Sequence, residues 1–186
     1  SNNVSHFKKK KYPKSINIIK GGKERSDSSL IALKYLKRFK PTNILIHDAS
    51  RPDFSINLLK KLILQLKDNE AVVPFIHSKD TIKYKIKNEL FNLERDKAFL
   101  TQTPQAFRFK DLYELSIRQK SRITDEATLF INNNFKVKFI SGENDNGKIT
   151  YKNDIKSHRS YFGIGFDIHR LVENKKLYLG GIKIPF

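Results

Sequence analysis

The most informative ten residues of this chain are Asn43-Ile44-Leu45-Ile46-His47-Asp48-Ala49-Ser50-Arg51-Pro52. They begin with a short apolar run, which is typical of a buried strand, and end abruptly in polar and charged residues. In an open α/β sheet, ligands bind just outside the carboxyl ends of the strands. The pattern therefore predicts a crevice in which Asp48 holds a metal ion or a substrate hydroxyl, and the planar guanidinium of Arg51 holds a phosphate. A solvated turn with an incidental ion pair is the alternative.

The segments before this stretch predict a strand, a turn and a helix. Residues 15–20 have the apolar content of a strand, which Gly21-Gly22 ends. A helix capped within residues 26–28 follows, with its apolar face at Leu30, Ile31, Leu33, Leu36 and Phe39. This order predicts a βαβ unit, with a parallel strand pair and a right-handed crossover.

The rest of the chain continues the α/β pattern. We expect a helix over residues 55–67, with Ile56, Leu59, Leu62, Ile63 and Leu66 facing inward. Further expected elements are a strand at 71–75, a hairpin arm at 81–86 and 90–93, an extended segment at 99–107, a helix at 112–119 capped by Asp111, a helix from 127, a strand at 135–140 and a helix at 154–161. A glycine-punctuated strand at 164–169 begins a second unit.

Composition limits the classes of protein that this chain can represent. Its 186 residues, 38% hydrophobic, suffice for one domain or for one domain and part of another. The sequence has no transmembrane-length apolar run, no signal-peptide pattern and no cysteine, so thiolate chemistry and disulfides are excluded. It also has no methionine, even at position 1, which predicts that the chain is a fragment.

The net charge of +18 raises the question of nucleic-acid binding. Lysines occur in every segment, however, and only Lys8-Lys9-Lys10-Lys11 forms a run. Attraction of small phosphorylated substrates fits the same charge. A basic nucleic-acid-binding module therefore stays an alternative, and it predicts tight and steeply salt-dependent binding to generic DNA or RNA.

Several other polar groups are candidates for binding. Gly21-Gly22 precede a helix start, where backbone N–H groups favour anions or polar bases. The ammonium of Lys148, in a polar turn, would stabilise charge on a transferring phosphoryl group. The remaining candidates are Thr81 and Arg95 on the arm, the polar wall of residues 101–107, and Thr124 at a helix start. An ordinary turn, a solvated hairpin or a helix cap is the alternative in each case.

Asp167 and His169 lie two positions apart on an expected strand, so both side chains point to one face. A carboxylate and an imidazole in this arrangement can share a divalent metal. Two ligands are too few for a zinc site, and a purely structural pair is the alternative.

Together, these motifs closely resemble the 2-C-methyl-D-erythritol 4-phosphate cytidylyltransferase family over about residues 17–161. The shared motifs are GG-x-ER-x-DS, HDA-x-RP, DT-x-K, a later R, QTPQ-x-F, TDEA and N-x-K-x-T. That family makes 4-diphosphocytidyl-2-C-methyl-D-erythritol from CTP in the non-mevalonate isoprenoid pathway. The tail, GIGFDIHR and LYLGGIKIP, resembles the first strands of 2-C-methyl-D-erythritol 2,4-cyclodiphosphate synthase, a CMP-releasing lyase that is fused to the transferase in some bacteria.

The resemblance implies a fold and a division into domains. Residues 1–160 would form an α/β, Rossmann-like nucleotidyltransferase sheet with helices on both faces and a β-arm. Residues 161–186 would contribute the first strands of a second α/β domain. The family's first strand and glycine-rich CTP loop would precede Ser1, so we expect the 186-residue chain to be inactive by itself.

The resemblance also assigns roles to individual residues. Lys148 and Asp48 match catalytic positions, Lys148 at the pentavalent phosphorus and Asp48 at the nucleotide and methylerythritol phosphate site. Asp167 and His169 match two of three metal ligands in the synthase. The matching substrate-binding positions are Gly22 and Ser28 against the cytosine, Ala49, Arg51, Thr103 and Thr124, and the arm residues Thr81 and Arg95, which reach the substrate of a neighbouring subunit.

Two departures from the family pattern are visible, and the resemblance carries further expectations. Ser50 replaces an alanine, and Lys23 replaces a common acidic residue, which puts base contacts there in doubt. The expected cofactors are Mg²⁺ for the transferase and Zn²⁺ or Mn²⁺ for the synthase. We expect a cytoplasmic homodimer formed through the arm, with trimeric synthase domains in the full enzyme and no nucleic-acid or membrane partner. A nucleotidyltransferase for another alcohol or sugar phosphate is a further alternative.

Overall fold

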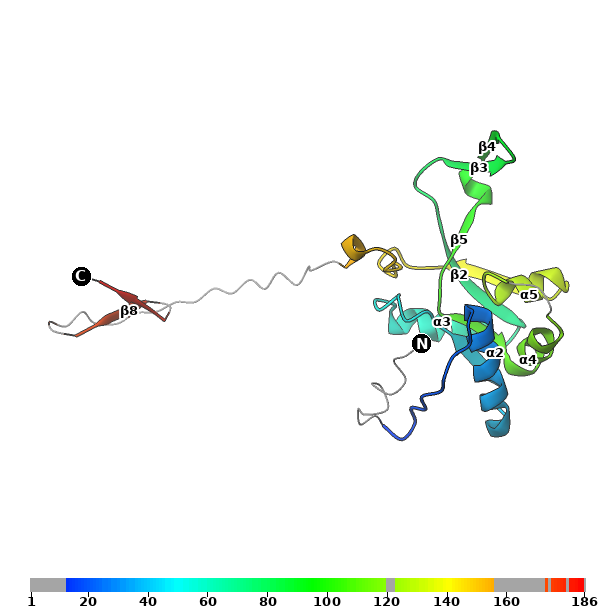
Figure 1. The fold of residues 1–186 in the computed structure, drawn as a ribbon, viewed down its shortest axis with the longest axis horizontal. Helices are drawn as coiled ribbons and strands as arrows, with labels where there is room; N and C mark the ends of the chain where they lie inside the picture. The colour runs from blue at the N-terminus through cyan, green and yellow to red at the C-terminus, as the bar shows by residue number, and fades with distance from the viewer. Residues whose placement is uncertain (1–12, 120–122, 156–172, 174, 180, 186) are drawn as a thin grey trace. The chain divides into compact units, whose positions relative to one another are not determined.

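The computed structural model describes residues 13–119, 123–155, 173, 175–179 and 181–185. The chain divides into two compact units, Ser1–Thr150 and Tyr151–Phe186. Figure 1 traces the chain through both units, and each unit is described here by itself.

A mixed five-stranded sheet organises the first unit. Strand β2 (Ala71–His77) is central: Ala71 pairs antiparallel with Phe107 and, along the opposite edge of the strand, parallel with Val137. The other strands are β1 (Asn43–Ile46), β5 (Phe99–Thr101), β6 (Gln105–Arg108) and β7 (Val137–Ser141), and the main path through the sheet is β1-β6-β2-β5. Because β1 and β2 both run antiparallel to β6, strands β1, β2 and β7 point the same way.

Helices cover both faces of this sheet, as expected from the sequence. Successive residues of a strand face opposite sides, and Val73 accordingly joins one core while Val72 joins the other. The first core contains side chains from α2 (Arg25–Leu36), α4 (Phe109–Arg118) and α5 (Ala127–Asn132), whereas α3 (Ile56–Gln65) covers the second (Figure 1). The α/β fold class is thereby confirmed.

The strand expected over residues 15–20 is wrong. Among the described residues this segment has no strand partner, and Ile16 is exposed while Ile18 and Ile19 are half-buried. A strand is stable only when its backbone groups find a ladder, so apolar content alone did not make one. The expected parallel βαβ pair ending at β1 is wrong for the same reason, because the described partner of β1 is the antiparallel β6.

The ends and faces of the helices correct further expectations. Helix α2 begins at Arg25 rather than after residues 26–28, because the N-cap is Glu24, whose N–H donates to Asp27. Leu33 is its buried residue. Helix α4 begins at Phe109, before Asp111, and a 3₁₀ helix η1 (Lys37–Phe39) follows α2.

Helix α3 begins close to its expected start, and its expected buried face is confirmed in part. The hydroxyl of Ser55 accepts a hydrogen bond from the N–H of Leu58. The residues that face the core are Leu58, Leu62 and Leu66, spaced four apart, whereas Ile56 and Ile63 are exposed. The expected inward positions Leu62 and Leu66 are confirmed, whereas those at Ile56 and Ile63 are wrong.

The hairpin arm is confirmed. Strands β3 (Ile82–Ile86) and β4 (Glu89–Leu93) pair antiparallel, and the turn contains Lys87 in the left-handed region, with φ of 52°. The hairpin continues from the ends of β2 and β5 (Figure 1). A 3₁₀ helix η2 (Arg95–Lys97) follows it, and Arg95 Nη1 donates to the carbonyl of Lys79 across the base of the arm.

The second unit contains a 3₁₀ helix η3 (Lys152–Asp154) and an antiparallel hairpin, β8 (Leu177–Leu179) and β9 (Ile182–Ile184). Gly181, in the connecting turn, has φ of 82°, which glycine adopts most readily. Asp167, His169, the strand expected at 164–169 and most of the helix expected at 154–161 lie outside the described residues. In the described part of the chain, no helix combines the length and the hydropathy needed to span a membrane.

Candidate active site

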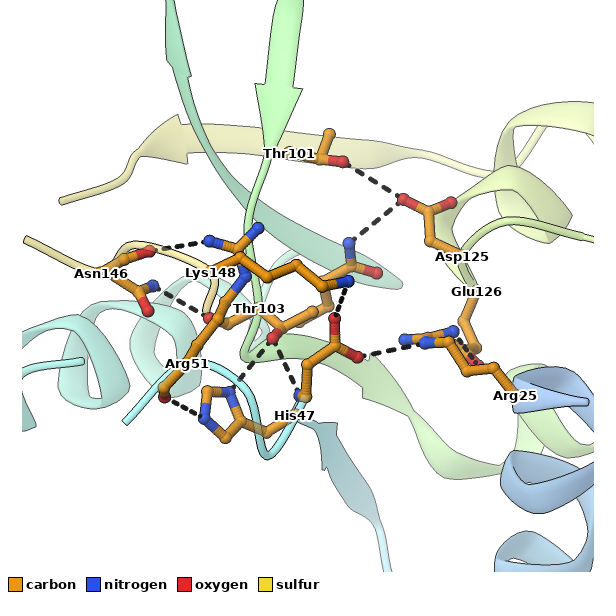
Figure 2. Close-up of polar contacts among 11 residues, drawn as sticks. Arg25, His47, Arg51, Thr101, Thr103, Asp125, Glu126, Asn146 and Lys148 are labelled. Atoms are coloured by element: carbon orange, nitrogen blue, oxygen red, sulfur yellow. Dashed lines mark hydrogen bonds and ion pairs between the residues drawn. The ribbon is translucent and has the colours of Figure 1, made fainter. Parts of the chain in front are cut away.

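A polar pocket of about 190 Å³ lies at the carboxyl end of β1. Side chains from α2, the turn after β1, the β5–β6 segment, the start of α5 and the loop after β7 surround it (Figure 2). Its lining residues are Arg25, Asp48, Arg51, Thr101, Thr103, Gln105, Thr124, Asp125 and Lys148. Three basic side chains, two carboxylates and three threonines in so small a space suit a ligand that carries both anionic and hydroxyl groups.

The Asp48 carboxylate forms ion pairs with two basic side chains. Its Oδ1 lies 3.1 Å from Arg25 Nε, and its Oδ2 lies 3.1 Å from Lys148 Nζ. Burial raises the pKa of Asp48, but the hydrogen bonds from Lys148 and Arg25 outweigh it and hold that pKa below its ordinary value. Asp48 is therefore an ionised acceptor whose two oxygens have different partners.

Arg25 joins Asp48 to a second carboxylate. Arg25 Nη1 lies 2.9 and 2.8 Å from the two carboxylate oxygens of Glu126, which is 1% exposed. Burial lowers the pKa of Arg25, but the combined effect of Glu126 and Asp48 is larger and raises it, so the net shift of the pKa is upward. The guanidinium thus ties the first turn of α2 both to the turn after β1 and to the residue that precedes α5 (Figure 2).

Thr103 and His47 fix the turn after β1. The hydroxyl of Thr103 accepts from the N–H of Asp48 at 3.0 Å and lies 3.2 Å from His47 Nδ1. His47 Nε2 lies 2.8 Å from the carbonyl of Arg51, which can only accept. Nε2 must therefore carry the proton, and Nδ1 accepts from the Thr103 hydroxyl. This chain of bonds determines where Asp48 lies.

The loop after β7 is docked against the same turn. Arg51 Nη1 donates to the carbonyl of Asn146 at 2.7 Å, and the N–H of Ile149 donates to the carbonyl of Ser50 at 2.8 Å. Asn146 also donates to the carbonyl of Thr103 at 2.9 Å. These bonds bring Lys148, 100 positions away in sequence, to Asp48.

Arg51 keeps one donor unused. Its Nε is buried and has no hydrogen-bond partner among the described residues. Burial lowers its pKa, and the Asp48 charge offsets only part of that effect. A buried donor without a partner is costly, so the position of Arg51 is held at some expense to the fold.

Asp125 organises the opposite wall of the pocket. Its Oδ1 accepts from the N–H and hydroxyl of Thr128 at the start of α5, at 3.1 and 2.7 Å. Its Oδ2 accepts from Gln105 Nε2 at 3.2 Å and from Thr101 Oγ1 at 3.4 Å. Asp125 therefore binds the first turn of α5 from the position before the N-cap residue Glu126, and it also builds the site.

The structure brings five of the predicted site residues into one pocket: Asp48, Arg51, Thr103, Thr124 and Lys148. Others lie elsewhere. Gly22 and Ser28 contact each other before and within the first turns of α2, with Gly22 N donating to Ser28 Oγ at 3.0 Å, and Ala49 is exposed beside Asp48. Thr81 and Arg95 belong to the arm, and Asp167 and His169 lie outside the described residues.

Sequence reasoning gave no role of their own to Arg25, Asp125 and Glu126, which line or support the pocket and occur inside the motifs GG-x-ER-x-DS and TDEA. Thr101 and Gln105 belong to the polar wall expected at residues 101–107, and both line the pocket. The role of the first three residues was hidden because each also suits an ordinary turn or cap, and only the tertiary structure brings Arg25 to Glu126.

Comparison with solved structures defines the class of protein. The fold is similar to 4-diphosphocytidyl-2C-methyl-D-erythritol synthase from Anaerococcus prevotii, with a TM-score of 0.74 and 33% identity over 82% of this chain and 74% of that chain. It is also similar to the bifunctional IspDF from Campylobacter jejuni, with a TM-score of 0.72 and 31% identity over 98% of this chain and 49% of that chain. This is the mixed α/β nucleotidyltransferase fold.

Within that class, the chain belongs to the IspD family, 2-C-methyl-D-erythritol 4-phosphate cytidylyltransferase, whose family model matches residues 1–163. A bifunctional enzyme IspD/IspF from Pelagibacter ubique is 51% identical over 181 residues, which are 97% of this chain and 49% of that protein. The Granulibacter bethesdensis enzyme of the same description is 34% identical over 177 residues. The chain spans about half the length of these curated relatives.

Proposed function

We propose that this chain carries the cytidylyltransferase site of a protein that transfers CMP from CTP to 2-C-methyl-D-erythritol 4-phosphate. A phosphate oxygen of the methylerythritol phosphate attacks the α-phosphorus of CTP in line. The new phosphorus–oxygen bond forms as the bond to the β-phosphate breaks, and pyrophosphate leaves with the electron pair. The observation that carries the proposal is the shared pocket in which Lys148, Arg51 and Asp48 converge.

Catalysis in this reaction rests on positioning and on charge stabilisation. Lys148 is half-exposed at the mouth of the pocket, with its ammonium free to shift from Asp48 to a phosphoryl oxygen. The guanidinium of Arg51, which lines the pocket, suits a phosphate oxygen of the acceptor substrate. Asp48 accepts a hydrogen bond from a substrate hydroxyl, and Thr103 and Thr124 add hydroxyl contacts on the same side.

The cytosine would lie against the start of α2. A Cβ added to Gly22 would come within 2.2 Å of Asp27 Cβ, so no side chain fits at this position. The glycine is therefore required by the close approach of Asp27, and the placement of the base rests on the match of Gly22 to the family position. Ser28 supports this backbone by accepting from the N–H of Gly22, and Ala49 adds a small side chain in the neighbouring turn.

The residues described here do not form a carboxylate cage for Mg²⁺. Both oxygens of Asp48 hold cations, both oxygens of Asp125 accept hydrogen bonds, and no cluster of three metal-ligating side chains exists among the described residues. Mg²⁺ would therefore enter on the triphosphate, where it neutralises charge that develops on the departing pyrophosphate.

Two further assignments belong to the same proposal. The arm exposes Tyr84, Ile86, Leu90 and Phe91, and a homodimer that buries them would carry Thr81 and Arg95 to the neighbouring site. The second unit would begin a cyclodiphosphate synthase domain, with Asp167 and His169 as ligands of Zn²⁺ or Mn²⁺. The intact protein would then be a cytoplasmic, multifunctional enzyme with transferase and lyase activities.

Isothermal titration calorimetry tests the substrate assignment. The 186-residue chain should bind 2-C-methyl-D-erythritol 4-phosphate at least about tenfold more tightly than glycerol 3-phosphate or inorganic phosphate, because the threonine and aspartate contacts need the additional hydroxyls. Equal affinity for the three compounds would contradict the choice of acceptor, although it would leave an anion site. Tighter binding of generic RNA, falling steeply with salt, would instead favour a nucleic-acid-binding module.

A further inference from the structure

We propose that Arg25 is a positioning residue of this site, which orients the Asp48 carboxylate by holding its Oδ1 while Glu126 anchors the guanidinium. The inference rests on the proposed function, since it concerns how Asp48 meets the acceptor substrate. The IspD motif GG-x-ER-x-DS contains Arg25, and no role in the pocket had been predicted for it.

The geometry divides the Asp48 carboxylate into a fixed half and an exchangeable half. Oδ1 accepts from Arg25 Nε, and Oδ2 accepts from Lys148 Nζ, each at 3.1 Å. Lys148 carries its charge on a flexible stem and is 48% exposed, so it can leave when a substrate arrives. Arg25 cannot leave as readily, because its Nη1 is bound to both oxygens of a buried carboxylate. Substrate would therefore meet Oδ2 in a constant orientation.

Only a guanidinium can make this connection. Arg25 uses Nε for Asp48 and Nη1 for Glu126, two donors fixed in one plane. A lysine has the same charge but a single nitrogen, so it cannot hold both carboxylates in the same way. The bridge therefore depends on shape as well as charge, which makes it separable by experiment.

The bridge also connects the two ends of the proposed active site. Arg25 is the first residue of α2, three positions after Gly22, where the cytosine is proposed to lie. Glu126 immediately precedes α5 and follows Asp125, which holds Gln105 and Thr101 on the far wall. The Arg25 side chain thus holds the start of α2, the Asp48 carboxylate and the residue before α5 in fixed positions relative to one another.

The test measures the affinity of the 186-residue chain for 2-C-methyl-D-erythritol 4-phosphate and, separately, for inorganic phosphate. Arg25→Lys keeps the charge but breaks the double contact. We expect it to weaken the binding of 2-C-methyl-D-erythritol 4-phosphate by about tenfold, which is the effect of losing one well-placed hydrogen bond to a charged group. The affinity for inorganic phosphate, whose binding needs Arg51 and Lys148 but not Asp48, should change by less than about threefold. The preference for the polyol phosphate over inorganic phosphate is then lost.

Matched variants separate positioning from charge and from folding. Arg38→Gln removes an arginine just beyond the other end of α2, where it lies over aromatic rings, and should leave both affinities unchanged. Arg25→Gln alone leaves Glu126 as a buried charge without its counter-ion, and that variant can fail to fold. The double variant Arg25→Gln/Glu126→Gln avoids this and should lose the same preference as Arg25→Lys.

The outcomes are distinct. A folded Arg25→Lys chain that keeps the wild-type preference would overturn the positioning role, because charge alone would then suffice. A parallel, equal loss for both ligands would also overturn it, since that would mark Arg25 as a general contributor to the anion site. If the unaltered chain binds neither ligand, the proposed function itself fails, and the role of Arg25 fails with it.

Discussion

Lys148 Nζ and Asp48 Oδ2 lie 3.1 Å apart, although 100 positions separate the two residues in the sequence. The contact exists because two loops dock on each other through Arg51 and Asn146, and through Ser50 and Ile149. Neither residue belongs to a helix or strand whose pattern would have linked them. The pair is therefore the most direct evidence that the scattered motifs build a single site.

Replacing Lys148 should affect ligand binding far more than stability. Because Lys148 is half-exposed, its ion pair stabilises the fold by no more than about 1 kcal/mol. Its loss removes a charge-assisted contact to phosphate, so Lys148→Ala should weaken the binding of 2-C-methyl-D-erythritol 4-phosphate by about tenfold in calorimetry. Lys138→Ala, on the exposed side of β7, is the matched control and should leave that affinity unchanged. Equal effects of the two variants would reduce Lys148 to one positive charge among many.

The acid stability of the protein should depend on Asp48. Its folded-state pKa lies below the unfolded value of about 3.9. Such a group stabilises the fold fully above its unfolded pKa, and the contribution disappears as the pH falls through its folded pKa. Urea unfolding between pH 2 and 7 should therefore show a constant free-energy difference between the wild type and Asp48→Asn above about pH 5, and a shrinking difference below pH 4. A difference that persists unchanged to pH 2 would contradict the cation contacts.

Replacing each of the two glutamines of the QTPQ segment by leucine should change the free energy of unfolding by very different amounts. Gln102 and Gln105 are 2% and 1% exposed, yet Gln102 exchanges hydrogen bonds with the backbone of Glu143, whereas Gln105 Oε1 has no partner among the described residues. Gln102→Leu leaves a buried N–H and carbonyl unpaired and should cost about 3 kcal/mol in denaturant unfolding. Gln105→Leu loses one bond to Asp125 but removes an unpaired acceptor, so its net effect should stay within about 1 kcal/mol.

The side-chain assignment of Gln105 follows from its neighbour. The carboxylate of Asp125 can only accept, so the amide nitrogen must face it and the oxygen must face away. A loss of stability in Gln105→Leu as large as in Gln102→Leu would mean that the oxygen does have a partner.

The proposed homodimer should depend on the apolar surface of the arm. Leu90, on β4, is 69% exposed, and a charged side chain there would be placed in the interface. Leu90→Asp should shift sedimentation equilibrium from dimer toward monomer by at least about tenfold in dissociation constant, since burying an unpaired charge is costly. Ile63→Asp, at an exposed apolar position on α3, is the control. If Leu90→Asp leaves the distribution unchanged, the arm is not the contact surface.

The sequence predicted the local elements well wherever a periodic pattern coincided with a cap or a turn. The helix expected from residue 55 and the hairpin expected at residues 81–86 and 90–93 are both elements that the structure contains. It failed at residues 15–20, where apolar residues suggested a strand but no described backbone offers a ladder. On α3 it placed Leu62 and Leu66 correctly but also expected Ile56 and Ile63 to face inward, because an apolar stripe broader than the contact leaves the exact face to the packing.

The sequence by itself determined most of the helices and strands of the first unit, the position of polar residues at the end of β1, and the resemblance to a cytidylyltransferase. These follow from short-range spacing, since a helix or strand repeats over only a few residues. The tertiary structure alone decided that β6 inserts antiparallel between β1 and β2, and that Arg25 reaches both Asp48 and Glu126. Both depend on contacts between segments far apart in the chain. The same local patterns allow many strand orders, and burial of the two cores selects one of them.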